Sequence, residues 1–434
     1  MPRWPRLGAF TLALPALAAA ASSSLAPVEH RLVRSIEANR AGAEALLERA
    51  VDVNSGTMNF EGVREVGAIF RKELDALGFR TRWIDGAPFG RAGHLVAEHP
   101  GEGRPILLIG HLDTVFEKDS PFQRFERLPG GRARGPGVID MKGGDVVVLL
   151  ALGALRDAGA LDRMNLSLIF TGDEEKAGEP LALARRDLLD LAARCEVAVG
   201  FEDGAGRPGE AVTARRGASD WVLRVTGRPA HSSQIFGDEV GAGAIFEAAR
   251  ILDGFYRALS GERYLTISPG AIVGGTTAAY DPAQNRGEAF GKTNVVAGTA
   301  QVQGDLRTVS PSQLATAKER MRGIAAAHLP RTNAELEFRD GYPPMAPTGG
   351  NAALLALYDR ASRDLGLGPV AATDPMRAGA ADAAFAAEKV KMAIDGIGLC
   401  GTDDHTDRET ADLATLPTQA ERAALLLLRL SGTR

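Results

Sequence analysis

The chain has 434 residues, of which 45% are hydrophobic and 24% charged, a balance typical of a globular protein large enough for two domains. Lys and Arg number 50 against 55 Asp and Glu, so the formal net charge of -5 provides no general basic surface for nucleic acid or anionic lipid. The two cysteines, Cys195 and Cys400, lie too far apart in the sequence for a CxxC metal knuckle. Any metal site must therefore use His and carboxylate ligands.

The first 26 residues have the pattern of a secretory signal peptide. Arg3 and Arg6 precede an apolar run from Leu7 to about Ala21, and small residues follow. Because this run is shorter than the roughly 20 residues that a membrane-spanning helix needs, an uncleaved anchor fits less well. The pattern predicts export to a periplasm or to the outside, with no membrane segment left after cleavage.

Hydrophobic periodicity next predicts a layer in which strands and helices alternate. The run PILLIG is continuously apolar, as expected of a strand that is buried on both faces. Such alternation indicates an α/β fold with a largely parallel sheet. The expected elements are two helices within 28–77, strands at 95–98 and 105–110, a helix at about 142–158, a strand at 165–171, a helix at about 181–193 and a strand at 197–201.

The pattern changes after about Ala214. Strand-like segments and two helices, at 242–259 and 312–328, follow in the order β-α-β-β-α, which predicts a small α+β unit inserted in the chain. From Ala334 onward, an extended segment and three helices are expected to return to the first layer. The predicted organisation is a signal peptide (1–26), the first part of a discontinuous larger domain (27–214), an inserted unit (215–328) and the second part of the larger domain (329–434).

Polar clusters follow three of the predicted strands. GHLDTV places His111 and Asp113 on the same side of an extended segment, TGDEE supplies Glu174 and Glu175, and GFED supplies Glu202. Open α/β sheets bind their ligands at the carboxyl ends of the strands. We therefore expect these side chains to share one site, in which Asp113 could hold the second ring nitrogen of His111.

Two loop segments offer further ligands. Asp140 lies between a Gly-Pro-Gly turn and a helix start in GPGVIDMKGG, and His405 lies among acids in GTDDHTDRE. Each cluster alone is better explained by an ordinary role, such as helix capping by Asp140 or simple exposure of the adjacent acids. Together they predict a site for two divalent ions, because His and carboxylates are zinc ligands and Asp140 could bridge. Glu174 could then act as general base on an activated water.

In this order, the motifs GHLDTV, GPGVIDMKGG, TGDEEKAGE, GFED, GRPAHSS and the H-x-x-x-E of His405 to Glu409 resemble those of a co-catalytic zinc peptidase family. That family includes bacterial glutamate carboxypeptidase, acetylornithine deacetylase, succinyl-diaminopimelate desuccinylase and aminoacylase. The resemblance runs from about residue 45 to the C-terminus and is closest to the glutamate carboxypeptidase branch. It implies a mostly parallel-sheet catalytic domain with an inserted α+β, ferredoxin-like domain that serves as lid and dimerisation domain.

The resemblance also implies a role for each residue of the larger domain's site. Asp113 would support His111 without binding metal, and the peptide bond after Asp140 would be cis. Two zinc ions would be bound per chain. The implied ligands are His111 and Glu202 on one ion and Glu175 and His405 on the other, with Asp140 bridging both and Glu174 as general base.

In the inserted unit, the resemblance implies that His231 reaches the active site of the partner in a homodimer and stabilises the developing oxyanion. Arg307 and Asn294 would contact substrate, and Arg307 has the planar charged group that suits a free carboxylate. Two departures from the family pattern stand out. Asp203 follows Glu202 where the family often has Pro, which makes Asp203 an alternative ligand, and MRAGAADAAF matches a family Gly-Gly-x-Asp-Ala run only loosely, with Asp382 as the matched acid.

The expected activity is hydrolysis of an amide bond next to a free carboxylate, releasing a C-terminal amino acid from a small peptide. One alternative is a deacylase that removes a small acyl group from an N-acyl amino acid. Another is an exported protein that keeps the fold but only binds ligand. The complete ligand set together with Glu174 argues against a protein that has lost its catalytic activity.

Overall fold

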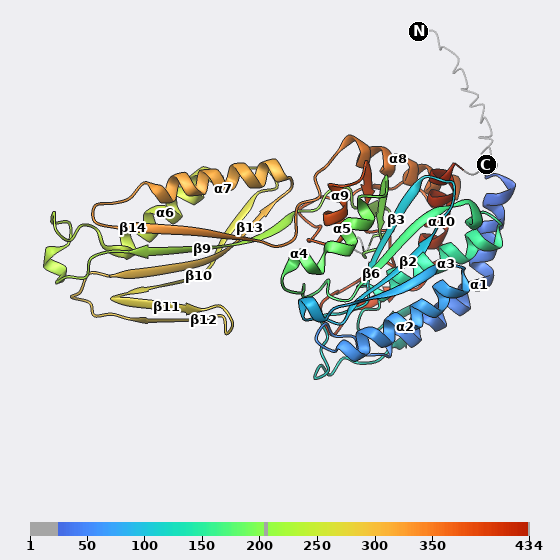
Figure 1. The fold of residues 1–434 in the computed structure, drawn as a ribbon, viewed down its shortest axis with the longest axis horizontal. Coiled ribbons are helices and arrows are strands. Elements are labelled where there is room, and N and C mark those ends of the chain that lie inside the picture. The colour runs from blue at the N-terminus through green and yellow to red at the C-terminus, as the bar shows by residue number, and fades with distance from the viewer. Residues whose placement is uncertain (1–24, 204–206, 433–434) are drawn as a thin grey trace, which may run out of the picture.

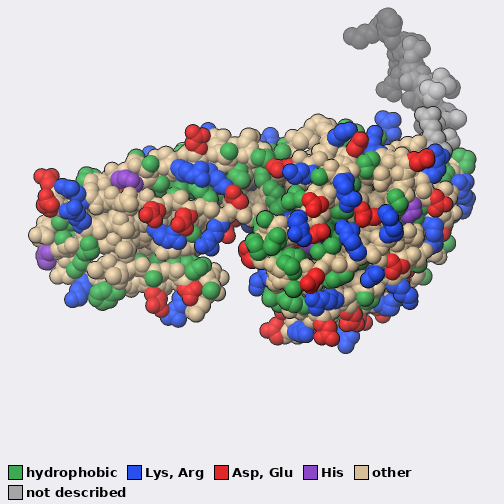
Figure 2. Space-filling model, in the orientation of Figure 1, with side chains coloured by type: hydrophobic (Ala, Val, Ile, Leu, Met, Phe, Trp, Pro, Cys, Tyr) green, Lys and Arg blue, Asp and Glu red, His purple; other side chains and the backbone are tan. Residues whose placement is uncertain are grey.

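The computed structural model describes residues 25–203 and 207–432, which form two units (Figure 1). The predicted signal peptide, residues 1–26, lies outside the described residues except for its last two. Within the described ranges, no helix combines the length and the apolar character that crossing a membrane requires. Figure 2 shows acidic and basic side chains interspersed over the visible face of both units, and the outline of the molecule is notched between them.

The large unit is built on a six-stranded sheet of order β1-β2-β6-β3-β7-β16. Neighbours from β6 to β16 are parallel, whereas β2 is antiparallel to both β1 and β6. The predicted mostly parallel sheet is confirmed, and β1 is an edge strand that the sequence pattern did not indicate. The strands are β1 (Arg80–Asp85), β2 (Gly93–His99), β3 (Pro105–His111), β6 (Asn165–Thr171), β7 (Val197–Gly200) and β16 (Met392–Ile394).

Helices cover both faces of this sheet (Figure 1). Alternate residues of a strand point to opposite faces, so Ile106 and Leu108 of β3 pack into one core, while Leu107 and Ile109 pack into another. This double burial explains the continuous apolar run. The first core includes α1 (Pro27–Val51), α2 (Phe60–Ala76), α3 (Lys142–Asp157), α8 (Gly349–Asp364) and α10 (Thr415–Ser431), and the second includes α5 (Arg186–Ala192) and α9 (Ala383–Ala387).

The helix expected at 181–193 is interrupted. It consists of α4 (Leu181–Ala184) and α5, which meet at Arg185. The side chain of Arg185 is only 1% exposed and forms an ion pair of 2.6 Å with Asp173. The helix is therefore interrupted at the residue whose side chain is buried against Asp173. Hydrophobic periodicity alone does not reveal this ion pair.

Short strands connect the loops of the large unit. A small sheet of order β17-β18-β5-β4 ties the loop that carries His405 to the segment before Asp140. The short elements of the large unit are β4 (Glu126–Leu128), β5 (Arg132–Arg134), β17 (Gly401–Thr402), β18 (Thr410–Asp412), the pair β8 (Glu210–Ala211) and β15 (Ala371–Ala372), and the 3-10 helices η1 (Ala87–Phe89) and η2 (Leu161–Arg163). A third 3-10 helix, η4 (Ser232–Gln234), lies in the inserted unit.

The inserted unit is an α+β fold, as expected. Its sheet has the order β10-β13-β9-β14, and α6 and α7 lie along one face (Figure 1). Between β10 and β13, the long loop at 276–292 forms a hairpin. The elements are β9 (Gly217–Thr226), α6 (Gly243–Leu259), β10 (Thr266–Gly275), β11 (Thr277–Asp281), β12 (Arg286–Phe290), β13 (Thr299–Thr308), α7 (Pro311–Ala326) and β14 (Asn333–Asp340).

The predicted end of the inserted unit at residue 328 is wrong. The segment from Ala334 was expected to return to the first layer, but β14 pairs antiparallel with β9 along its whole length. Leu336 and Phe338 alternate along β14 and pack against the core of the inserted unit, which explains this pairing. The inserted unit therefore extends to Asp340.

Candidate metal centre

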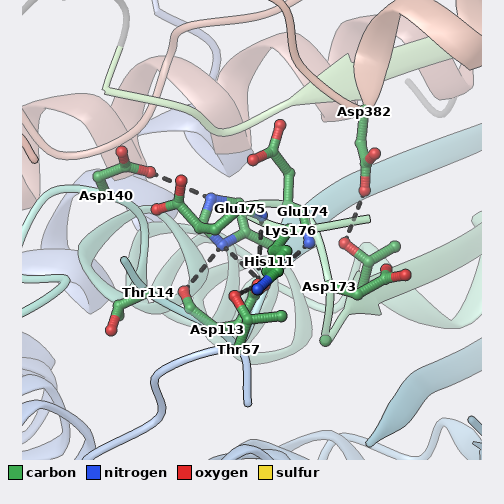
Figure 3. A network of polar contacts seen from close by, with 12 residues as sticks. Thr57, His111, Asp113, Thr114, Asp140, Asp173, Glu174, Glu175, Lys176 and Asp382 are labelled. Atoms are coloured by element: carbon green, nitrogen blue, oxygen red, sulfur yellow. Dashed lines mark hydrogen bonds and ion pairs between the residues drawn. The ribbon is translucent and has the colours of Figure 1, made fainter. Parts of the chain in front are cut away.

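Two groups of His and carboxylate side chains lie at the carboxyl edge of the large sheet. Within each group the candidate ligand atoms lie within 4.8 Å of one another. One group is His111, Asp140 and Glu202, and the other is Asp140, Glu175 and His405. Because Asp140 belongs to both groups, the five residues form one cluster, part of which is seen in Figure 3.

The order of the strands explains why three of these residues meet. His111 ends β3, Glu175 follows β6 and Glu202 follows β7. These strands are parallel neighbours in the order β6-β3-β7, so their carboxyl ends share one edge.

Asp140 has the geometry of a bridging ligand. Its Oδ1 lies 3.1 Å from His111 Nε2, and its Oδ2 lies 2.9 Å from His405 Nε2. The remaining contacts join His405 Nε2 to Glu175 Oε2 at 3.1 Å and His111 Nε2 to Glu202 Oε1 at 3.6 Å. Each carboxylate oxygen of Asp140 therefore faces the histidine of a different ligand group.

The cluster fits divalent cations by its donors and its charge. Buried Glu175 Oε1 has no hydrogen-bond partner among the described residues, so it is available to a ligand. Hydrogen bonds to Asp140 and Glu175 raise the pKa of His405 to about 11, because the crowded carboxylates stabilise positive charge at this place. Imidazole nitrogens and carboxylate oxygens together are a donor set that zinc accepts.

Glu409 ties the two ligand-bearing loops together. Its buried carboxylate accepts hydrogen bonds from the main-chain N–H groups of Gly137 at 2.9 Å, Ile139 at 2.8 Å and Asp140 at 3.1 Å. The Asp140–Met141 peptide bond is cis, as the resemblance implied. The sequence placed Glu409 in the H-x-x-x-E motif without giving it a role, and the structure shows that it holds the loop of Asp140.

The side chain of Asp113 was expected to hold the second ring nitrogen of His111, but its main hydrogen bonds are to other groups. His111 Nδ1 lies 3.0 Å from the main-chain oxygen of Asp113 and 3.5 Å from its carboxylate Oδ1. The carboxylate instead accepts hydrogen bonds from Thr57 Oγ1 at 2.7 Å and from the main-chain N–H groups of Glu174 at 3.0 Å and Glu175 at 3.2 Å (Figure 3). Asp113 therefore fixes the segment that carries both glutamates.

A cavity of about 200 Å³ adjoins the cluster, and Glu174 lines it without belonging to either ligand group. Asp203, the alternative ligand, also lines the cavity but lies outside the groups. The lining also contains two arginine side chains, Arg215 and Arg377, that the sequence pattern did not predict. The signal that could have indicated Arg377 is its position directly before the AGAAD run. The lining residues are Asp140, Glu174, Glu175, Glu202, Asp203, Val212, Arg215, Arg377, Ala378, Gly379, Ala380, Asp404 and His405.

The three candidate residues of the inserted unit lie elsewhere. His231 is exposed, with its Nδ1 2.8 Å from Ser233 Oγ, and the neighbouring Ser232 N–H donates to the main-chain oxygen of Asn294 at 2.9 Å. Arg307 Nε donates to the carboxylate of Asp305 at 2.9 Å. None of the three is among the described residues that line the cavity. Within one chain, His231 and Asn294 are therefore close to each other but are not brought to the metal cluster.

A parallel-sheet unit with two linked ligand groups, an adjacent carboxylate and an inserted α+β unit defines a dinuclear metal-dependent hydrolase. The model of peptidase family M20/M25/M40 matches residues 107–429, which is well over half of the chain. The chain belongs to this family, so the resemblance found in its motifs is confirmed.

Relatives of known sequence or structure support this assignment. Carboxypeptidase G2 of Pseudomonas sp. (strain RS-16) is 26% identical over 400 residues, covering 89% of this chain and 88% of its own. A probable succinyl-diaminopimelate desuccinylase of Staphylococcus epidermidis is 32% identical over 148 residues, covering 32% of this chain and 34% of its own. The fold resembles that of the Bacillus subtilis YXEP protein, a dinuclear metal binding peptidase, with a TM-score of 0.65, 17% identity and coverage of 92% and 100%.

Proposed function

We propose that the chain is a zinc-dependent carboxypeptidase that hydrolyses an amide bond next to a free carboxylate and releases a C-terminal amino acid. The observation that carries this proposal is the position of Glu174, which lines the cavity beside two ligand groups joined by Asp140. Similarity to a carboxypeptidase over 89% of the chain supports the direction of cleavage.

In this proposal, each residue of the site has a defined task. His111, Glu202, Glu175 and His405 would hold two zinc ions, and Asp140 would be shared between them. When bound, the ions would polarise the scissile carbonyl and acidify water. Glu174 takes the proton of the attacking water on its carboxylate and passes it to the leaving nitrogen. Burial raises the pKa of the Glu174 carboxyl well above its usual range.

The deacylase alternative keeps some support, because the desuccinylase relative is 32% identical over about a third of the chain. A panel of amide substrates assayed with the zinc-loaded protein separates the two activities. We expect dipeptides and N-aroyl amino acids with a free C-terminal carboxylate to be cleaved faster than acetyl or succinyl amino acids. A preference for the small acyl substrates would favour the deacylase, and no turnover on any member would contradict both.

Removal of metal is expected to destabilise the protein. The ligand carboxylates are crowded, and burial together with the charge of Asp140 raises the pKa of Glu175 to about 7. A metal that binds only the folded state contributes about 2.7 kcal/mol when its free concentration is 100 times its Kd. Differential scanning calorimetry before and after chelation, with re-addition of zinc as control, checks this prediction. An unchanged melting temperature after complete removal would contradict a metal site in this cluster.

We also propose that the chain forms a homodimer in which His231 of one copy acts in the site of the other copy. In its own chain, His231 is not among the described residues that line the cavity. Ile245 and Phe246 on α6 and Ile272 on β10 are exposed apolar side chains that such a contact would cover. Glu174→Gln and His231→Gln proteins, each inactive, are expected to regain activity when dissociated and mixed. Random re-association would give about a quarter of wild-type activity, because half the dimers hold one intact site. Absence of recovery in mixed dimers of verified mass would contradict the proposal.

A further inference from the structure

Two chain segments connect the inserted unit to the large unit, and they pair with each other. Arg215 and Met345 exchange main-chain hydrogen bonds of 3.0 Å in both directions, and the Ala218 N–H donates to the main-chain oxygen of Tyr342 at 2.9 Å. Tyr342 follows β14 by two residues, so its main chain belongs to this paired connection.

The side chain of Tyr342 reaches from the connection into the large unit. Its hydroxyl donates a hydrogen bond to the main-chain oxygen of Glu174 at 2.6 Å and accepts one from Arg185 Nη2 at 2.6 Å. The ring packs edge-on against Phe385, with ring centroids 5.1 Å apart, and the Arg185 guanidinium lies 5.5 Å from its centroid. The hydroxyl therefore has both a donor and an acceptor partner in a packed position.

Arg185 is a fixed anchor for this hydroxyl. Besides its ion pair with Asp173, its Nε lies 2.7 Å from Asp382 Oδ1, and its Nη2 also donates to the main-chain oxygen of Asp173 at 3.0 Å. Thr171 donates to the other oxygen of Asp382 at 2.6 Å, which joins this network to the end of β6. Removal of the Tyr342 hydroxyl takes a hydrogen bond from the Glu174 carbonyl and one acceptor from Arg185 Nη2. Arg185 keeps its contacts with Asp173 and Asp382, so the guanidinium should stay in place.

Glu174 is thus held from two sides. Asp113 accepts its main-chain N–H from within the large unit, whereas Tyr342 donates to its carbonyl from the connection. These two hydrogen bonds restrain the peptide planes on both sides of Glu174, and with them the direction of its side chain. A displacement of a reacting group by about 1 Å can cost about 100-fold in rate.

We propose that Tyr342 is a positioning residue for Glu174, and that through it the orientation of the base depends on the connection to the inserted unit. This inference rests on the proposed function, in which Glu174 is the general base. It assigns to Tyr342 no contact with substrate or metal.

The test is Tyr342→Phe, which removes the hydroxyl and keeps the ring, with Tyr358→Phe as matched control. Tyr358 is a fully buried tyrosine in α8, outside the lining of the cavity. We expect kcat of Tyr342→Phe to fall about 10- to 100-fold, with KM and zinc content unchanged. In the metal-free protein, amide hydrogen exchange in residues 171–178 should quicken about fivefold in this variant and stay at the wild-type rate in Tyr358→Phe.

The outcomes separate the two proposals. Wild-type kcat and wild-type exchange in Tyr342→Phe would overturn the positioning role. If the wild-type protein cleaves no amide, the proposed function fails, while the exchange measurement on the metal-free protein still decides whether Tyr342 holds this segment. Equal loss of melting temperature and of kcat in both tyrosine variants would also overturn the proposal, because a general packing defect would then suffice.

Discussion

Replacement of Glu174 by Gln is expected to lower kcat for amide hydrolysis by about 10²–10⁴-fold, the range typical of a lost general base. Gln has nearly the same size and can still donate and accept hydrogen bonds, but it cannot take a proton from water. The main chain at this position is held by Asp113 and Tyr342, so the substitution should leave the segment in place. Zinc content should also be unchanged, because Glu174 belongs to neither ligand group.

Glu175→Gln is the matched control, because it changes the adjacent residue in the same way. Glu175 belongs to the group with Asp140 and His405, so this variant should lose zinc as well as activity. Steady-state kinetics and metal analysis of both proteins distinguish a base from a ligand. A wild-type rate in Glu174→Gln, or equal zinc loss in both variants, would refute the assignment of Glu174 as base.

Replacement of Arg185 by Met is expected to lower the free energy of unfolding by about 3–5 kcal/mol, the usual cost of removing one partner from a buried ion pair. Arg185 contacts both Asp173 and Asp382, whose side chains are buried. Without the guanidinium, the hydrogen bonds that the described residues still donate to these carboxylates come from the neutral Gly178 N–H and Thr171 hydroxyl. Urea unfolding followed by circular dichroism measures the loss.

The next residue in the chain provides the control. Arg186 has a 60% exposed side chain, and its contact with Asp187 is 3.7 Å long, so Arg186→Met should change stability by no more than about 0.5 kcal/mol. Adding Asp173→Asn and Asp382→Asn to Arg185→Met should restore part of the lost stability, because the unpaired charges are then gone. Equal stability of the two arginine variants would show that the buried network does not contribute as argued.

Local pattern was sufficient to predict most elements of the large unit. The strand expected at 165–171 coincides with β6, and the helix expected at 142–158 differs from α3 by one residue. Burial on two faces of a parallel strand and on one face of a helix leaves a periodicity in the sequence itself. β1 was missed because it is an edge strand whose residues are exposed or half-buried.

Strand pairing needed the tertiary structure. The alternation in β14 suits either sheet, and only its pairing with β9 and the packing of Leu336 and Phe338 decide that it belongs to the inserted unit. The interruption at Arg185 has the same origin, since its partners lie on other elements. Such choices depend on contacts between residues far apart in the chain.

The ligands of the metal cluster could be predicted from the amino-acid sequence. Parallel strands bring their carboxyl ends to one edge of a sheet, and the residues that follow the strands meet there. His111, Glu175 and Glu202 obey that rule. Tyr342 and Arg377 do not follow a strand of that sheet. Tyr342 meets Glu174 across 168 residues of chain, at a place where its hydroxyl and ring also contact Arg185 and Phe385. Local sequence carries the type and periodicity of side chains, whereas the support of a catalytic group comes from long-range contacts that exist only once the two units are assembled.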